Sequence, residues 1–114
     1  MVERGDIVLV DLEPVKGSEQ GRIRPCLVVQ NDISNKYSPN TIIVPITSKI
    51  NDKEYPATVI INPNESGLKE VSSVLCNQIK TISIKHRLIK KLGSLNESKM
   101  IKVNSALKVS LGLD

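Results

Sequence analysis

The chain has 114 residues, a formal net charge of +4 and a sequence pI near 9.2. This length predicts one domain over residues 1–114, with a core small enough to gain stability from dimerisation. Because the first residues carry no signal-peptide pattern and no apolar run approaches membrane-spanning length, we expect a cytoplasmic protein without membrane contact.

Strands are expected to dominate the first 92 residues, because the apolar residues are almost all Val, Ile and Leu, which favour pleated structure. Apolar runs predict about six strands, at 7–12, 26–30, 41–46, 56–61, 72–81 and 88–92. Pro45 lacks a backbone donor and places the third strand near a sheet edge or a bulge. The segments 31–40 and 62–67 are predicted to be a polar loop and a turn.

The last stretch predicts a helix. Its start is ambiguous, because Ser94 and Glu97 have the spacing of a capping box while Asn96 could cap alone, and Gly112 is a plausible end. Apolar residues recur at three- and four-residue steps, which marks one helix face: Met100, Val103, Leu107 and Leu111. Short strands followed by a helix favour a mainly β fold, a small, partly closed barrel whose open edge or face the helix covers.

No metal or cofactor site is predicted. Cys26 and Cys76 match no metal-ligand spacing, and each lies in an apolar run, so we expect two buried, reduced thiols; a disulfide or a catalytic thiol is the alternative. His86 is the only histidine and stands between Lys85 and Arg87, which predicts a surface position. Any chemistry must then use carboxylate, hydroxyl and guanidinium groups.

Positive charge is concentrated in the second half of the chain. Between residues 80 and 102, Glu97 is the only acidic side chain, against six lysines and Arg87. Such an imbalance suggests an anionic partner, either nucleic acid or an acidic protein segment. A solvated surface with no partner is the plainer alternative.

The loop at 17–25, between the first two predicted strands, combines polar side chains with two glycines and can present them to a ligand. Arg24 could hold a phosphodiester bidentately, while Thr47 and Ser48 could donate to its oxygens from the end of the third strand. Glu19 is the nearest candidate general base. For RNA, attack by the ribose 2′-OH needs a base, an acid and charge stabilisation, but no metal. Alternatively, Arg24 simply pairs with Glu19 and Thr47 caps a strand end.

Several motifs in chain order resemble the MazF/PemK endoribonuclease toxins of type II toxin–antitoxin systems. They are Gly5-Asp-Ile-Val-Leu-Val-Asp-Leu12, Gly17-Ser-Glu-Gln-Gly21, Arg24-Pro25, Gln30-Asn-Asp32, Pro45-Ile-Thr-Ser48, Gln78-Ile-Lys-Thr81 and the spaced residues of the terminal helix. The resemblance covers essentially the whole chain, which makes it more specific than any single motif.

The resemblance implies a small SH3-like barrel of the PemK/CcdB type with a C-terminal helix, acting as a homodimer. It also implies metal-independent, sequence-specific cleavage of single-stranded RNA that leaves a 2′,3′-cyclic phosphate and a 5′-hydroxyl. A cognate, MazE-like antitoxin with an acidic, extended tail would hold this activity off.

Carried over by position, Arg24 matches the catalytic arginine and Thr47 the catalytic threonine. The predicted substrate-binding residues are Ser18, Glu19, Gln20, Asn31, Ser48, Gln78 and Lys80. Because an arginine pKa lies above about 12, Arg24 is a poor base and better suited to stabilise charge or to act as an acid. Lys80 replaces a common arginine and loses bidentate geometry. With only two tyrosines as aromatics, base reading is expected to rely on hydrogen bonds.

Two other functions fit the same fold. Toxins that poison DNA gyrase share this barrel and lack nuclease chemistry, so a protein-binding role stays open, as does an RNA-binding module without catalysis. The presence of Arg24, Thr47 and the loop residues Ser18 to Gln20 together favours the nuclease.

Overall fold

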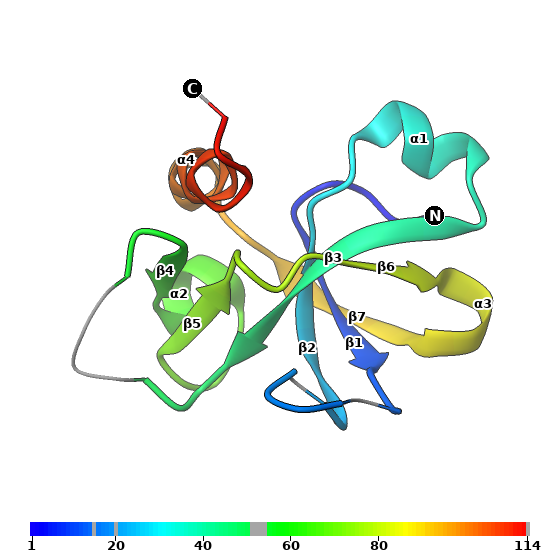
Figure 1. Cartoon of the computed structure of the whole chain (residues 1–114), viewed down its shortest axis with the longest axis horizontal. Coiled ribbons are helices and arrows are strands. Elements are labelled where there is room, and N and C mark those ends of the chain that lie inside the picture. The colour runs from blue at the N-terminus through cyan, green and yellow to red at the C-terminus, as the bar shows by residue number, and fades with distance from the viewer. Residues whose placement is uncertain (15, 20, 51–54, 114) are drawn as a thin grey trace.

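The computed structural model describes residues 1–14, 16–19, 21–50 and 55–113, and its central element is β3 (Asn40–Thr47). The other strands are β1 (Asp6–Asp11), β2 (Ile23–Val28), β4 (Thr58–Ile61), β5 (Ser72–Leu75), β6 (Lys80–Ser83) and β7 (Leu88–Ser94). They form a seven-stranded sheet in the order β4-β5-β3-β2-β1-β7, with β6 also paired to β3, and every pair is antiparallel (Figure 1). The mainly β prediction is confirmed, although with seven described strands rather than six.

Pro45 lies in this central strand and not at a sheet edge, so the sheet-edge alternative is wrong. On one side β3 pairs with β2, where Pro45 is opposite Cys26. On the other side it pairs with β6 through residues 40–43 and with β5 through residues 46–47. Pro45 therefore lies at the break between two ladders, where a residue without a backbone donor is tolerated.

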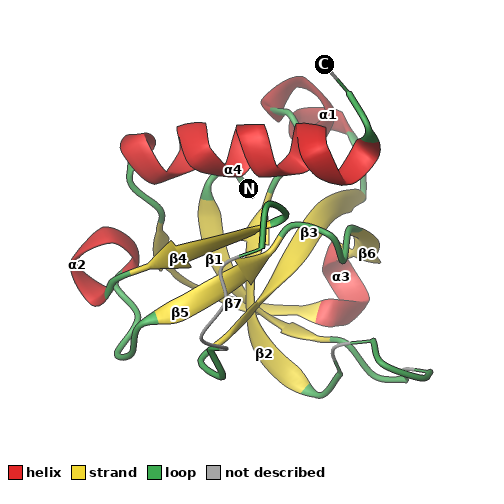
Figure 2. Ribbon diagram, turned by 60° about the vertical axis from the view of Figure 1, so that its left-hand side comes forward, coloured by secondary structure: helices red, strands yellow, loops and turns green. Residues whose placement is uncertain are grey.

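The core has two parts, one on each face of the sheet. Neighbouring residues alternate between them, because successive side chains of a strand point to opposite faces. Ile7, Leu27 and Val44 belong to the first cluster, which the helix α4 (Glu97–Leu111) covers with Val103 and Ala106 (Figure 2). The second cluster contains the alternate residues Val8, Cys26, Val28 and Ile43. Burial on both faces explains the apolar runs at 26–28 in β2 and 42–46 in β3.

Helix α4 is capped by Asn96 and ends at Gly112, as one of the two predicted alternatives has it. The Asn96 side chain accepts a hydrogen bond from the Lys99 amide at 3.0 Å, and Gly112 ends the helix with φ of +69°. Ser94 is the last residue of β7, so the capping-box alternative is wrong. Met100 and Leu107 pack against the first cluster as expected, whereas Leu111 is 59% exposed.

Three short helices were not predicted. The polar loop at 31–40 contains α1 (Asp32–Tyr37), the turn at 62–67 contains α2 (Pro63–Ser66), and α3 (Ile84–Arg87) precedes β7. The predicted strand at 72–81 is interrupted: β5 and β6 are separated by a turn in which the Gln78 amide donates to the Leu75 carbonyl at 3.1 Å. Among the described residues, no helix combines the length and apolar character needed to cross a membrane.

Candidate active site

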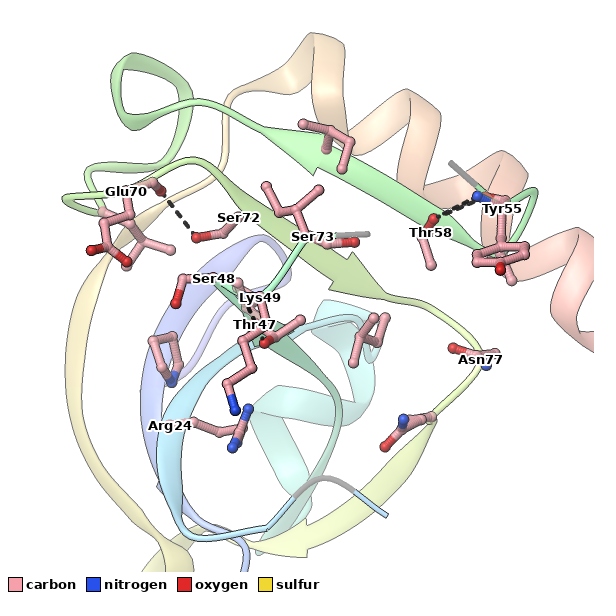
Figure 3. Close-up of a pocket in the computed structure, with 18 of the residues that line it drawn as sticks. Arg24, Thr47, Ser48, Lys49, Tyr55, Thr58, Glu70, Ser72, Ser73 and Asn77 are labelled. Carbon is pink, nitrogen blue, oxygen red and sulfur yellow. Dashed lines mark hydrogen bonds between the residues drawn. The ribbon is translucent and has the colours of Figure 1, made fainter. Parts of the chain in front are cut away.

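The ends of β2, β3, β4 and β5 enclose an open groove of about 880 Å³ (Figure 3). Arg24 enters it from β2, and Thr47, Ser48 and Lys49 enter it from the end of β3. Gln78 lines the same groove from the turn after β5. The folding of the sheet therefore brings together four residues that the sequence singled out: Arg24, Thr47, Ser48 and Gln78.

Arg24 is held in a fixed orientation by its own loop. Its Nε donates to the Gly21 carbonyl at 2.7 Å, and its side chain is half-buried. Within the described residues the guanidinium has no carboxylate within 4.0 Å, so the predicted alternative of an Arg24–Glu19 ion pair is wrong. Because Nε is already bonded, the two terminal nitrogens are the ones that can form a forked pair of hydrogen bonds to an anion.

Thr47 does cap the end of its strand, but this leaves its hydroxyl proton for a ligand. The Lys49 amide donates to Thr47 Oγ1 at 3.1 Å. A hydroxyl that accepts a backbone hydrogen bond still has its own proton to donate. Capping the strand end and donating a hydrogen bond to a ligand are therefore compatible roles for Thr47.

A second cavity of about 430 Å³ lies beside the groove, and Asn77 and Gln78 line both. Ser18, Glu19 and Lys80 line this second cavity and not the groove that contains Arg24. Gln20, the remaining loop residue predicted to bind substrate, lies outside the described residues.

Glu19 is separated from Arg24 by this arrangement. Its carboxylate accepts a hydrogen bond from the Lys16 amide at 2.7 Å, which holds it within its own loop. The groove has a different carboxylate, Glu70, which the sequence analysis missed, and its wall also includes Lys49 and Tyr55. No sequence motif marked these three residues, because they come from connections whose position depends on how β4 and β5 pair with β3.

Asn31 is not at this site. It follows the opposite end of β2 from Arg24, and its side chain accepts a hydrogen bond from the Ser34 amide at 2.8 Å as the cap of α1. It lines neither cavity. A role in base reading, predicted from the sequence, has no support in its position.

Both cysteines are free and buried, as predicted, and neither is suited to be a nucleophile. Burial raises the pKa of Cys26 to about 12, although the charges of Arg24 and Lys80 partly oppose this, and burial also raises the pKa of Cys76 to about 12. A thiol with such a pKa stays protonated at neutral pH, where only the thiolate is reactive. His86 is exposed on α3, as predicted. Within the described ranges, no three His, Cys, Asp or Glu side chains gather as metal ligands.

The fold and the site together define a class of protein: a curved antiparallel sheet, a helix packed across one face, and an arginine and a threonine on one groove at the end of the central strand. A family model described as "PemK-like, MazF-like toxin of type II toxin-antitoxin system" matches residues 3–111. The chain belongs to this family.

Relatives and solved structures agree with this assignment. The chain is 49% identical to the "Endoribonuclease MazF" of Staphylococcus epidermidis, over all of this chain and 94% of the relative. It is 48% identical to that of Staphylococcus saprophyticus, over 99% and 93%. An "Endoribonuclease in complex with its cognate antitoxin from Mycobacterial species" has a TM-score of 0.83 at 25% identity, covering 100% of this chain and 98% of that one. MazF of Deinococcus radiodurans, with a TM-score of 0.81 at 24% identity over 98% and 97%, supports the fold alone.

Proposed function

We propose that this endoribonuclease toxin cleaves single-stranded RNA at specific sequences without a metal ion, and that Arg24 and Thr47 are its catalytic residues. The observation that carries the proposal is that Arg24 and Thr47 line one open groove. The hydrogen bond from Nε leaves the terminal nitrogens of Arg24 to bind an anion, and Thr47 keeps its hydroxyl proton to donate. Hydrogen-bond donors that are held in place before the substrate arrives are what stabilises charge in a transition state.

The reaction begins with attack of a ribose 2′-oxygen on the adjacent phosphorus. Arg24 binds the non-bridging oxygens through its terminal nitrogens, and Thr47 donates to one of them as negative charge develops. A base removes the 2′-proton, the bond to the 5′-oxygen breaks, and the leaving oxygen takes up a proton. The products are a 2′,3′-cyclic phosphate and a 5′-hydroxyl. Among the described residues, Glu19 in the second cavity and Glu70 in the groove are the carboxylates available as bases.

The second cavity extends the substrate path. Ser18, Gln78 and Lys80 offer a hydroxyl, an amide and a cation to nucleotides next to the cleaved bond. Amide groups recognise the edges of unpaired bases, which is how single-stranded RNA is read. Lys80 contributes charge without the bidentate geometry of an arginine.

Family membership supports the proposal of two partners. We propose a cytoplasmic homodimer that a cognate antitoxin holds inactive, with an acidic, extended antitoxin segment competing with RNA for the same cationic surface. Exposed apolar side chains on α1 and α4, among them Ile33, Tyr37 and Ile101, support association with another protein surface. Sedimentation at micromolar concentration should give a species of twice 12.5 kDa, and a monomer there would contradict the dimer.

Cleavage of a long RNA in excess EDTA tests the proposal. We expect discrete cuts with 5′-hydroxyl ends, and an Arg24→Ala variant that is slower by about 10²- to 10³-fold. Arg24→Lys, which keeps the charge but loses the fork, should also be strongly impaired. The matched control is Arg22→Ala, since Arg22 is an exposed arginine of the same loop that lines neither cavity.

Two results would contradict the proposal. If Arg24→Ala cut RNA at the rate of the unaltered protein, Arg24 would not be catalytic. If the folded, antitoxin-free protein left every RNA intact, a protein-binding toxin would be the better description. Circular dichroism of each variant checks that a lost activity is not a lost fold.

A further inference from the structure

Tyr55 is an exposed aromatic residue in the groove that the proposed chemistry does not use. Its side chain is 53% exposed, and it lines the same groove as Arg24 and Thr47. Figure 3 shows the ring beside Thr58. Arg24 lies well away from it, on a different part of the groove wall. A large ring left open to solvent on the wall of a binding groove is available to a ligand.

The backbone that carries this ring is fixed to the sheet. The Tyr55 amide donates to Thr58 Oγ1 at 3.1 Å, and the Thr58 hydroxyl donates to the Tyr55 carbonyl at 2.9 Å. The Thr58 amide donates to the same carbonyl at 2.9 Å. Thr58 in turn begins β4 and is opposite Leu75 of β5. Three hydrogen bonds to a paired strand hold the backbone of Tyr55 in place, so a ligand that contacts the ring does not have to order the main chain that carries it.

The other aromatic residue of the chain, Tyr37, is placed differently. It lies on α1, away from both cavities, and the Lys36 ammonium is 5.5 Å from the centre of its ring. Since the sequence has two tyrosines and neither phenylalanine nor tryptophan, Tyr55 is the one aromatic side chain that can meet a base in the groove. The expectation that base reading relies on hydrogen bonds was based on the small number of aromatic rings. It did not take into account that one of them, Tyr55, lies in the groove.

We propose that Tyr55 is a substrate-specificity residue that stacks on the base of a nucleotide next to the phosphate bound by Arg24 and Thr47. The inference rests on the proposed function, because it names how the same groove binds RNA. Every base has a π face, so one ring selects by stacking strength and by position, not by hydrogen bonding. Stacking of this kind changes the affinity for RNA by about 10- to 100-fold for each base.

Fluorescence tests the contact directly, because the chain has no tryptophan. In a Tyr37→Phe variant, Tyr55 is the only fluorophore. The probe is a 10-nucleotide RNA that contains the cut sequence, with a 2′-deoxyribose at the cleaved position so that it binds without reacting. We expect this RNA to quench the emission of Tyr55. The matched control is Tyr55→Phe, in which only Tyr37 emits, and whose emission should change only by the light that the RNA absorbs.

Kinetics give a second readout that a structural role alone would not produce. Tyr55→Phe keeps the ring and should have a KM within about 2-fold of the unaltered protein, whereas Tyr55→Leu should raise KM by about 10- to 100-fold with a much smaller change in kcat. Removing single bases from the RNA then locates the contact. An abasic nucleotide at the stacked position should weaken binding to the unaltered protein but not to Tyr55→Leu, because the interaction is already gone.

The outcomes separate the two proposals. If anisotropy of a labelled copy of the RNA shows binding while the emission of Tyr55 stays constant, or if Tyr55→Leu retains the original KM, the stacking inference is wrong and the nuclease stands. If the protein neither binds nor cuts RNA, the proposed function fails, and the inference with it.

Discussion

At the scale of single residues, the proposed function gives Thr47 two tasks for one hydroxyl. It accepts a hydrogen bond from the Lys49 amide as the chain leaves β3, and in the proposed reaction it donates its proton to the phosphate. Serine retains this hydroxyl, whereas valine removes it with little change of shape, so the two replacements test what the hydroxyl contributes.

We predict that Thr47→Ser retains most of the cleavage rate and that Thr47→Val loses about 10²-fold, the usual cost of removing one donor from a charge-stabilising site. Single-turnover cleavage of an oligonucleotide measures this step without product release. A Thr47→Val variant with an unchanged rate would remove Thr47 from the chemistry. Thermal unfolding of both variants shows whether the lost contact to Lys49 also loosens the fold.

How much of the site could be predicted from sequence depended on where each residue lies. Arg24 and Thr47 could be paired because each stands at the end of an apolar strand, and adjacent strands bring their ends together. Asn31 stands at the other end of β2, where its polar side chain caps a helix that the sequence did not predict. Lys49 and Tyr55 belong to the connection after β3, whose path depends on the pairing of β4 with β5 and has no sequence motif.

At the scale of elements, Gly93 marks the point where β7 meets α2. A Cβ at this position would lie 2.8 Å from the Ser66 carbonyl oxygen and 3.8 Å from its carbon. The obstacle is backbone and not a flexible side chain, so relief requires the strand and the helix to separate. The glycine is needed here for space, because its φ lies outside the left-handed region.

We predict that Gly93→Ala lowers the free energy of unfolding by about 1–3 kcal/mol, the range for overpacked sites. Urea denaturation measures the change. The neighbouring variant Ser94→Ala is the control, since Ser94 is exposed on the same strand and should stay within about 0.5 kcal/mol. A Gly93→Ala protein as stable as the original would mean that β7 and α2 can shift apart at no cost.

The elements that could be predicted from the sequence are those whose apolar pattern extends over enough residues to be recognised. The apolar runs of β1, β2 and β3 and the three- and four-residue repeat in α4 are each set by burial of many side chains. The helix α1 has six residues, fewer than two turns, and α2 and α3 have four each, so none builds an apolar face. The turn between β5 and β6 has neither glycine nor proline, which is why 72–81 resembled one strand.

At the scale of the whole molecule, β3 is the connection between the two halves of the sheet, because it pairs with β2 as well as with β5 and β6. The radius of gyration is 13.0 Å, close to the value of about 13 Å expected for one compact domain of this length. We propose on these grounds that residues 1–114 unfold as one domain. Cys76 lies in the first core cluster and Cys26 in the second, so the two thiols report on opposite faces of the sheet.

This placement leads to a prediction about alkaline pH. Each folded-state pKa, about 12, lies above the reference value of 9.0, so folding favours the protonated thiol. Stability from both thiols is therefore fully present below pH 9 and is lost as pH rises from 9 towards 12, by at most about 1.4 kcal/mol per pH unit for each thiol. Urea denaturation at pH 8, 9 and 10 should show this decline.

The same experiment with Cys26→Ala, Cys76→Ala and the double variant isolates the contribution of the thiols from that of every other group in the chain. The single variants should each lose part of the alkaline slope, and the double variant should lose both parts even if the cavities lower its stability at pH 8.

The two thiols also test whether the chain unfolds as one domain. If it does, iodoacetamide should modify both thiols over the same range of urea concentration. If Cys26 became reactive at a lower urea concentration than Cys76, the two faces of the sheet would unfold separately, and β3 would not couple them.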